Sequence, residues 1–508
     1  MQPLEVERTS VSVDSVHHAP SRRRNKALEK QDSFLASQVF DESTSTDGGP
    51  FSAYANTTNT ILGAGTLAVP IAMSSAGLLS YLLMTAGVIS VHSMTVNWLV
   101  MVADYLPKDV ARNYEGIAQE YLGTFAAHMI SLVFIFGGLS LGMSRMLFTS
   151  RSLAPLLASL FDDDGVVRPQ ELRSWELRML WSCGLLVVLP LGMLRDISKL
   201  RFASGLAICT LTFAAAFIVF CNSSALVKQP KLGSGFEFIV NFDSSFFLSL
   251  AMTTSNFSCH IAAIPIYGSL GAQKSSMRKV VLAAMITAAV VYQLVGLTSY
   301  ARFGYLDSDG SNILEIVAEH INHKRQPLQF ALVSVASAGV AVSLVFGMPV
   351  VLWALRSVLL SYYRAASAVR AKWAGCSARQ AEAIQNADPS FVEWTTVTML
   401  IVFAILILAT AVPDIQVVMS FGGSLGGTFI AFMYPALFHL KVVKGHESLR
   451  GALRRQNAAE LGVIAMSVVY GVVCLSISLQ KIVRTLGESQ SSEAVQSDSN
   501  SSTLMLWN

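Results

Sequence analysis

The chain has 508 residues, of which 53% are hydrophobic and only 14% are charged, and its formal net charge at pH 7 is +3. Soluble domains carry about 25% charged residues, so this composition excludes an ordinary soluble protein and favours an integral membrane protein. A net charge this small gives no indication of nucleic-acid binding. The six cysteines form no CxxC pair, so the sequence predicts neither a disulfide framework nor a metal site.

Eleven apolar segments have the length of about 20 residues that a helix needs to cross a membrane. In chain order they are 52–77, 78–103, 124–148, 176–194, 202–221, 244–268, 279–301, 328–353, 394–412, 415–440 and 459–481. We therefore expect an all-α polytopic membrane protein with 11 transmembrane helices and a transmembrane domain over 51–482. The polar tails at 1–50 and 483–508 are predicted to be disordered, and 112–123 is predicted to form an interfacial helix.

The distribution of Lys and Arg predicts the orientation in the membrane. If the N-terminus is cytosolic, the inner loops carry two, three, three, five and five basic residues, in the order 104–123, 195–201, 271–279, 354–393 and 441–457. The outer loops carry fewer, so we expect a cytosolic N-terminal tail and a C-terminal tail on the opposite side. The sequence does not decide between a vacuolar or lysosomal membrane and the plasma membrane.

The first and sixth predicted spans are the most polar and the most interrupted. The first contains NTILGAGTLAVP at 59–70, and the sixth contains SLAMTTSNFSCHIAAIP at 249–265. Gly and Pro cost about 1 and about 3 kcal/mol in a helix interior, so both spans are predicted to be broken helices. Spans that lie five apart in two odd-numbered halves cross in opposite directions. The pattern predicts a five-plus-five inverted-repeat transporter fold with broken helices 1 and 6.

A break in each span gives the backbone a chemical role. Unwinding at Gly63 and Gly65 exposes N–H groups at the start of the next half-helix, near Thr66, where the helix dipole favours a carboxylate. Freed carbonyls accept an ammonium group or coordinate a cation. A zwitterionic α-amino acid carries both charges at a matching spacing. The alternative interpretation is a face of small residues for close helix packing, with a proline kink.

Several sequence blocks carry a resemblance to a known family. They are NTILGAGTLAVP at 59–70, FSCH-x4-PIY at 257–267, YARFG at 300–304, NIL at 312–314, PVVLWALR at 349–356, PDI-x2-V at 413–418, FGG at 421–423 and FMYP at 432–435. In this order, they resemble the amino acid/auxin permease family, and within it the vacuolar and neutral amino acid transporters. The resemblance covers about 51–482.

The resemblance implies secondary active transport of amino acids, driven by protons or sodium and without another cofactor. It places the substrate between the unwound parts of spans one and six. By this analogy, the carboxylate end of the site comprises Gly63, Ala64, Gly65 and Thr66. The residues expected around the amino group and side chain are Ser255, Asn256 and Ser258.

The driving ion has two sets of candidates. In sodium-coupled relatives, an Asn in span one and a hydroxyl in span eight help to hold the cation; Asn59 matches the first. No hydroxyl lies directly before Pro349, although Ser343 substitutes after a shift in register. For a proton, His260 in the span-six break is the best candidate, since histidine titrates near neutral pH. The alternative is a neutral histidine that fixes the unwound turn.

The other ionisable groups of the spans have simpler interpretations. We expect His92 and His128 to be packed or interfacial, and Asp243 and Asp414 to lie near span ends. Arg145 is expected to snorkel or to pair across helices, with a role in substrate binding as the alternative.

The leading functional hypothesis is an amino acid transporter, and the absence of a clear acid or base near the breaks favours neutral substrates. A second hypothesis is an amino acid sensor that uses the same pocket and reports through the N-terminal tail, to which a cytosolic partner would bind. A third is a channel or a membrane enzyme. The sequence has no Walker loop, which disfavours direct ATP-driven transport. It also has no Ser-His-Asp order or metal-ligand spacing that would support catalysis, so an enzyme is not predicted.

Overall fold

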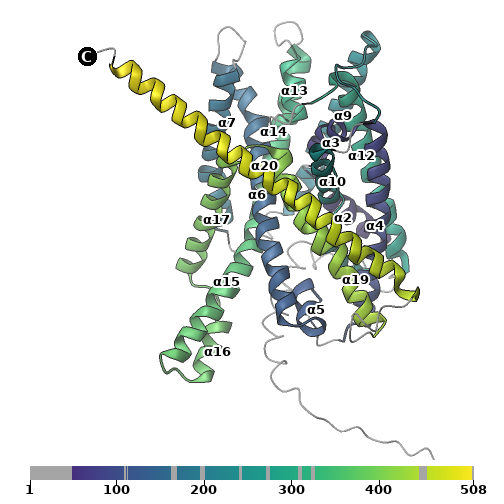
Figure 1. Cartoon of the computed structure of the whole chain (residues 1–508), viewed down its shortest axis with the longest axis vertical. Helices are drawn as coiled ribbons and strands as arrows, with labels where there is room; N and C mark the ends of the chain where they lie inside the picture. Colours follow the sequence, from purple (N-terminus) through teal and green to yellow (C-terminus); the bar gives the residue numbers. More distant parts are fainter. Residues whose placement is uncertain are drawn as a thin grey trace, which may run out of the picture.

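The computed structural model describes most of the chain. The described residues are 49–63, 65–107, 110, 112–161, 169–194, 201–239, 243–270, 275–306, 312–321, 327–445 and 455–505. Ala64 and nearly all of the predicted N-terminal tail lie outside these residues. The cytosolic partner predicted to bind this tail therefore stays a prediction. Figure 1 shows the described helices as a bundle that the C-terminal helix crosses obliquely.

The described residues form helices joined by short connections, with no strand among them. In chain order the α-helices are α2 (Pro50–Ile61), α3 (Gly65–Ala76), α4 (Leu78–Tyr105), α5 (Tyr114–Tyr121), α6 (Thr124–Phe161), α7 (Pro169–Cys183), α8 (Leu189–Gly192), α9 (Arg201–Lys228), α10 (Ser244–Asn256), α11 (His260–Ser269), α12 (Met277–Phe303), α13 (Ile313–Glu319), α14 (Pro327–Phe346), α15 (Met348–Trp373), α16 (Ala378–Asn386), α17 (Phe391–Ala411), α18 (Ile415–Leu425), α19 (Tyr434–Phe438) and α20 (Ala458–Met505). Wider π-helical turns join α7 to α8 and α18 to α19.

Nine helical segments in the described part of the chain are long and apolar enough to cross a membrane. They are Leu78–Tyr105, Thr124–Ala158, Glu171–Gly192, Leu206–Lys228, Met277–Phe303, Pro327–Trp373, Phe391–Ala411, Ile415–Val443 and Ala458–Gly487. Each overlaps one of the predicted spans. The prediction of an all-α, multi-pass membrane protein is therefore confirmed at this level.

Two helical segments extend beyond their predicted ends. The predicted eighth span is two helices, because α14 ends at Phe346 and α15 begins after Gly347 and continues to Trp373. Pro349 lies in the first turn of α15, where backbone N–H groups have no partner within the helix. Its missing N–H therefore costs no helical hydrogen bond. The backbone of α20 is helical as far as Met505, where the sequence predicts a tail from 483. Continuing an existing helix avoids the cost of nucleating a new one.

The two short helix pairs α2–α3 and α10–α11 lie against the long helices and differ in burial along their length. All 12 residues of α3 are buried, and α3 packs against α10, α12 and α18. In α2, only Ala53, Thr57 and Ile61 are buried, and this helix packs against α11 and α12. The second half of the first span is therefore enclosed by protein, whereas the first half is buried along one face only.

The connection between α9 and α10 packs against the end of α12 and the start of α4. Its backbone pairs with the end of α12, where the Gly233 N–H donates to the Ala301 carbonyl (2.9 Å) and the Tyr305 N–H donates to the Ser234 carbonyl (2.8 Å). The carbonyl of Glu237 accepts from the Leu78 N–H (3.1 Å) at the start of α4. The loop thus satisfies the free Leu78 N–H at the start of α4 and links α4 to the end of α12 through backbone hydrogen bonds.

Gly304 is the residue on which this junction depends. Its φ of +75° is unfavourable for residues with a side chain, and a Cβ there would collide with the Ser234 carbonyl oxygen. Gly304→Ala should therefore cost about 1–3 kcal/mol and lower the melting temperature of the purified protein. Gly87→Ala is the matched control, because Gly87 is exposed within α4 and has open space around its Cβ position. Equal melting temperatures for the two variants would contradict this account.

Candidate functional site

The first helix pair is interrupted in the middle of its apolar segment. α2 ends at Ile61, and α3 begins at Gly65. Between them, Leu62 has extended backbone angles, and the Thr66 N–H donates to the Gly63 carbonyl at 3.0 Å to close a tight turn. The backbone therefore leaves the helical hydrogen-bond pattern at the position where the GAG sequence predicts it.

The second helix pair is interrupted in the same way. α10 ends at Asn256, and α11 begins at His260. The Ser258 N–H donates to the Ser255 carbonyl (3.2 Å), and the residues between the helices are not helical. Carbonyl groups at the end of α10 thereby lose their partners in the next helical turn.

The two interruptions are in direct contact. A Cβ atom placed on Gly65 would collide with the side-chain carboxamide of Asn256. The missing side chain of Gly65 at the start of α3 therefore leaves room for Asn256 from the other break. The predicted site residues Gly65 and Asn256 are brought together.

Tyr292 of α12 connects the two breaks from outside them. Its hydroxyl lies 2.7 Å from the carbonyl oxygen of Ile61 and 3.4 Å from that of Asn256, and it donates toward these helix-end carbonyls. Its ring is fully buried and meets the edge of Phe257, with ring centroids 5.3 Å apart. Sequence reasoning missed Tyr292, because it lies in the regular helix α12 and only the packing of α12 shows its role.

Four polar atoms at or near the breaks are buried without a hydrogen-bond partner among the described residues. They are the hydroxyl oxygens of Thr58 and Thr66, the carboxamide nitrogen of Asn256 and Nδ1 of His260. A buried polar group without a partner costs about 1–3 kcal/mol. Such groups fit a site that receives a small polar solute, and Asn256 and Thr66 are among the residues predicted for it.

The remaining predicted substrate residues have distinct positions. Gly63 has open space where a side chain would lie. The Thr66 amide is already used within the turn, so its contribution to a carboxylate falls to its hydroxyl. Ser255 and Ser258 are half-buried, and the Cβ of Ser255 lies close to Gly423 of α18.

His260 is buried at the first position of α11 and has a second histidine beside it. Its Nε2 lies 2.9 Å from the Thr95 hydroxyl, which also lies 3.0 Å from the Val91 carbonyl. Its Nδ1 is buried without a partner in the described structure. The ring of His92, a residue predicted to be packed, is buried 5.0 Å from that of His260 between centroids.

The predicted sodium ligands lie on different helices. Asn59 is on α2, before the break, and Ser343 is on α14, where its carbonyl accepts from the Gly347 N–H (3.1 Å). No hydrogen bond joins the two in the described structure. The described residues also contain no group of three His, Cys, Asp or Glu side chains that could hold a metal ion.

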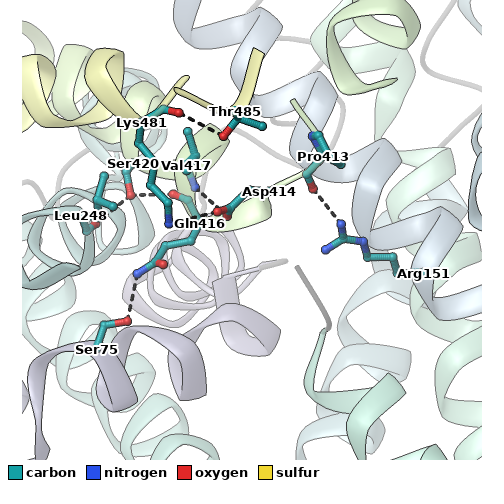
Figure 2. Close-up of polar contacts among 10 residues, drawn as sticks. All are labelled: Ser75, Arg151, Leu248, Pro413, Asp414, Gln416, Val417, Ser420, Lys481 and Thr485. Carbon is teal, nitrogen blue, oxygen red and sulfur yellow. Dashed lines mark hydrogen bonds and ion pairs between the residues drawn. The ribbon is translucent and has the colours of Figure 1, made fainter. Parts of the chain in front are cut away.

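The start of α18 lies against the other side of α3 and α10, and its polar contacts are drawn in Figure 2. Asp414 caps α18 and forms an ion pair with Lys481 of α20 (3.1 Å). Gln416 donates to the Ser75 hydroxyl at the end of α3 (3.0 Å), and Ser420 donates to the Leu248 carbonyl of α10 (2.7 Å). One short helix thus joins α3, α10 and α20 at the enclosed end of the first segment.

Arg151 of α6 extends this cluster. Its guanidinium donates to the Pro413 carbonyl (2.8 Å), as Figure 2 shows, and lies 3.5 Å from the Glu176 carboxylate of α7. The closure of this end therefore includes α6 and α7 as well. The site at the two breaks is shut off on the side of α3 and α18.

A comparison with known proteins identifies the family to which the chain belongs. The family model for transmembrane amino acid transporter proteins matches residues 46–480, so the chain belongs to that family. This is a family of transporters and not of enzymes.

Two curated relatives and one solved structure are similar to the chain. Vacuolar amino acid transporter 5 of Schizosaccharomyces pombe is 23% identical over 442 residues, which are 85% of this chain and 95% of that protein. Sodium-coupled neutral amino acid transporter 7 of Xenopus laevis is 26% identical over 272 residues, which are 52% of this chain and 53% of that protein. The inward-facing structure of Mhp1 matches with a TM-score of 0.51 at 12% identity, covering 87% of this chain and 91% of Mhp1. The chain and Mhp1 therefore share a fold.

Gly65→Val tests the contact between the two breaks. The added side chain would displace Asn256 and separate the helix ends, so amino acid uptake in reconstituted liposomes should be abolished while the protein still inserts and folds. Gly462→Val in α20 is the control, because its Cβ position is open, and it should keep normal uptake. Normal uptake by Gly65→Val would contradict the proposed geometry.

Tyr292→Phe tests the connection to α12. Removing the hydroxyl leaves the Ile61 carbonyl without this donor, at a cost of about 1–3 kcal/mol, and the breaks should lose their relative positions. We expect a lower melting temperature and reduced uptake from the same preparation. Tyr363→Phe, at an exposed tyrosine of α15, should change neither quantity. A Tyr292→Phe protein that matches wild type in both would show that the bridge is dispensable.

Proposed function

We propose that this chain is a secondary active transporter that binds one amino acid between the α2–α3 and α10–α11 breaks and moves it by alternating access. The observation that carries the proposal is the direct contact of Gly65 with Asn256, beside buried polar atoms that have no partner in the described structure. A zwitterion supplies the acceptor and donor groups that such a site requires.

In this proposal, the two helix pairs are the first and sixth of eleven spans in a five-plus-five inverted repeat. Together with the nine long segments, the two helix pairs give eleven spans, and their breaks lie five spans apart. The shared fold with Mhp1 supports the arrangement. The distribution of basic residues supports a cytosolic N-terminus, which puts the α2 end on the cytosolic side and the α18 cluster on the opposite side.

Alternating access then follows from the unequal ends of the first span. The α3 end is held shut through Gln416, Ser420 and the Asp414–Lys481 ion pair, whereas α2 is buried along one face only. To open on the other side, the protein must separate α18 from α3 and α10. Polar contacts that exchange with water on opening cost less to break than an apolar seal of the same size.

For the driving ion we favour a proton, with His260 as the group that carries it. Its Nδ1 is buried without a partner in the described structure, and its ring lies beside His92 at the α11 break. The name of the Xenopus laevis relative instead supports coupling to sodium and transport of neutral amino acids, so sodium stays the alternative ion. Neutral amino acids are the substrates predicted from sequence, and the name of the Schizosaccharomyces pombe relative favours a vacuolar membrane.

One experiment tests the function and the driving ion together. The purified protein is reconstituted in liposomes, and uptake of a panel of labelled amino acids is measured under a proton gradient, a sodium gradient and neither. We expect saturable uptake that the proton gradient stimulates. His260→Gln should lose this stimulation but keep exchange of labelled for unlabelled substrate. Uptake of no amino acid under any gradient would contradict transport, and stimulation by sodium alone would contradict the proton.

A further inference from the structure

Helix α15 continues well beyond the length that its span requires. The segment Pro327–Trp373, formed by α14 and α15, has 47 residues, about twice the number that a helix needs to cross a membrane. Trp353 and Leu360 of α15 pack with Trp394, close to the start of α17 at Phe391. The part of α15 after Leu360 therefore extends past the level at which α17 begins.

This part of α15 and α16 pack on each other as a hairpin, residues 361–386, that has almost no core of its own. Among its described side chains, only Ala368 and Ala381 are buried. Four side chains of α15 without a charge instead share one exposed face, which we call the α15 stripe, at steps of four, three and four residues: Tyr362, Ala366, Val369 and Trp373. Trp373 is 86% exposed. Such a face is suited to a second amphipathic helix.

The inner end of the α15 stripe touches the bundle. The hydroxyl of Tyr362 lies 2.7 Å from Nδ1 of His128 on α6. Val369 and Trp373, further along the helix, are 49% and 86% exposed, so the outer part of the stripe is the part left uncovered.

Basic side chains border the α15 stripe on both sides. At 100° per residue, Arg370 and Lys372 lie on opposite flanks of the stripe, and both are exposed. Arg379, at the start of α16, is exposed as well. Within the described part of the chain, no ion pair involves these three residues. A second copy of the hairpin would bring like charges together, so the stripe favours a partner that is both apolar and acidic.

The chain itself carries a segment of this chemistry. Residues 27–42, ALEKQDSFLASQVFDE, precede the first described residue and contain four acidic residues and one basic residue. In a helix, Leu28, Leu35 and Val39 would share one face. The connecting residues 43–48 reach about 20 Å when extended, and the segment itself is about 24 Å long as a helix. The segment is therefore not confined to the neighbourhood of α2.

The tail and the hairpin lie on the same side of the membrane in the eleven-span arrangement proposed above. The tail precedes the first span and the hairpin follows the eighth, which is an even number of crossings. α5 follows the second span and marks the same side, whereas α13 follows the seventh span. Figure 1 shows α5 and α16 at one end of the bundle and α13 at the other.

We propose that residues 27–42 of the N-terminal tail bind along the α15 stripe, with their acidic side chains toward Arg370, Lys372 and Arg379. The contact covers Val369 and Trp373 and gives the hairpin the apolar core that it lacks. The inference rests on the eleven-span arrangement and does not depend on transport, so its tests use no transport assay.

Limited trypsin digestion of the purified full-length protein in detergent tests the contact. The bond after Lys30 lies inside the segment, and the bond after Arg8 lies outside it. Trp373→Ser removes the largest exposed side chain of the stripe and should speed cleavage after Lys30 by about tenfold or more, with cleavage after Arg8 unchanged. Ile384→Ser, at an exposed apolar residue of α16, is the matched control and should change neither rate. Equal rates after Lys30 in wild type and Trp373→Ser would overturn the inference.

A photo-crosslinking residue at position 369 identifies what covers the stripe. The full-length Val369→benzoylphenylalanine protein is irradiated in liposomes of phosphatidylcholine and phosphatidylserine, and the products are mapped by mass spectrometry. We expect a crosslink to residues 27–42 of the same chain. The added changes Arg370→Glu and Lys372→Glu should lower its yield severalfold, and an unchanged yield would contradict the charge pairing. A crosslink to lipid or to a second copy, or no crosslink, would overturn the inference and leave the transport proposal untouched.

Discussion

A helix that is interrupted inside a membrane frees backbone groups that lipid cannot satisfy, and the way these groups are met organises the whole site. Tyr292 lies against the ends of α2 and α10 and donates toward a carbonyl from each. Because one hydroxyl serves both, the two breaks have to lie side by side, with Gly65 against Asn256. The Thr66 hydroxyl and the Asn256 carboxamide nitrogen stay without a partner in the described structure, and in our proposal a small doubly charged solute supplies one.

The same constraint explains why the two ends of the site differ. At the α3 end, polar side chains of α18 satisfy groups from α3 and α10, and ion pairs add α20, α6 and α7. These contacts add polar links to an end at which α3 and α18 are also packed with apolar side chains. Transport needs such a reversible closure, since a site that cannot open on the second side only binds.

The sequence predicts the parts of this structure that have a local cause. The GAG pattern and the polar run before His260 indicate both interruptions, and hydrophobic length gives the nine long segments. The sequence gives no signal for Tyr292 or for His92 beside His260, because neither residue departs from its own helix pattern. Their roles come from helices that meet across about 165 to 230 positions of sequence separation. The α14–α15 junction is intermediate: Pro349 marks it, but only packing shows Arg145 against Gly347.

The central claim is that two interrupted helices hold an amino acid between them, and an experimental structure of the protein with a transported amino acid bound tests it most directly. The account predicts ligand density beside the contact of Gly65 with Asn256, with the α-carboxylate toward the start of α3 and the ammonium group toward the carbonyls of the α10 break. Density at another position, or α2–α3 and α10–α11 running as continuous helices with the ligand bound, would contradict it.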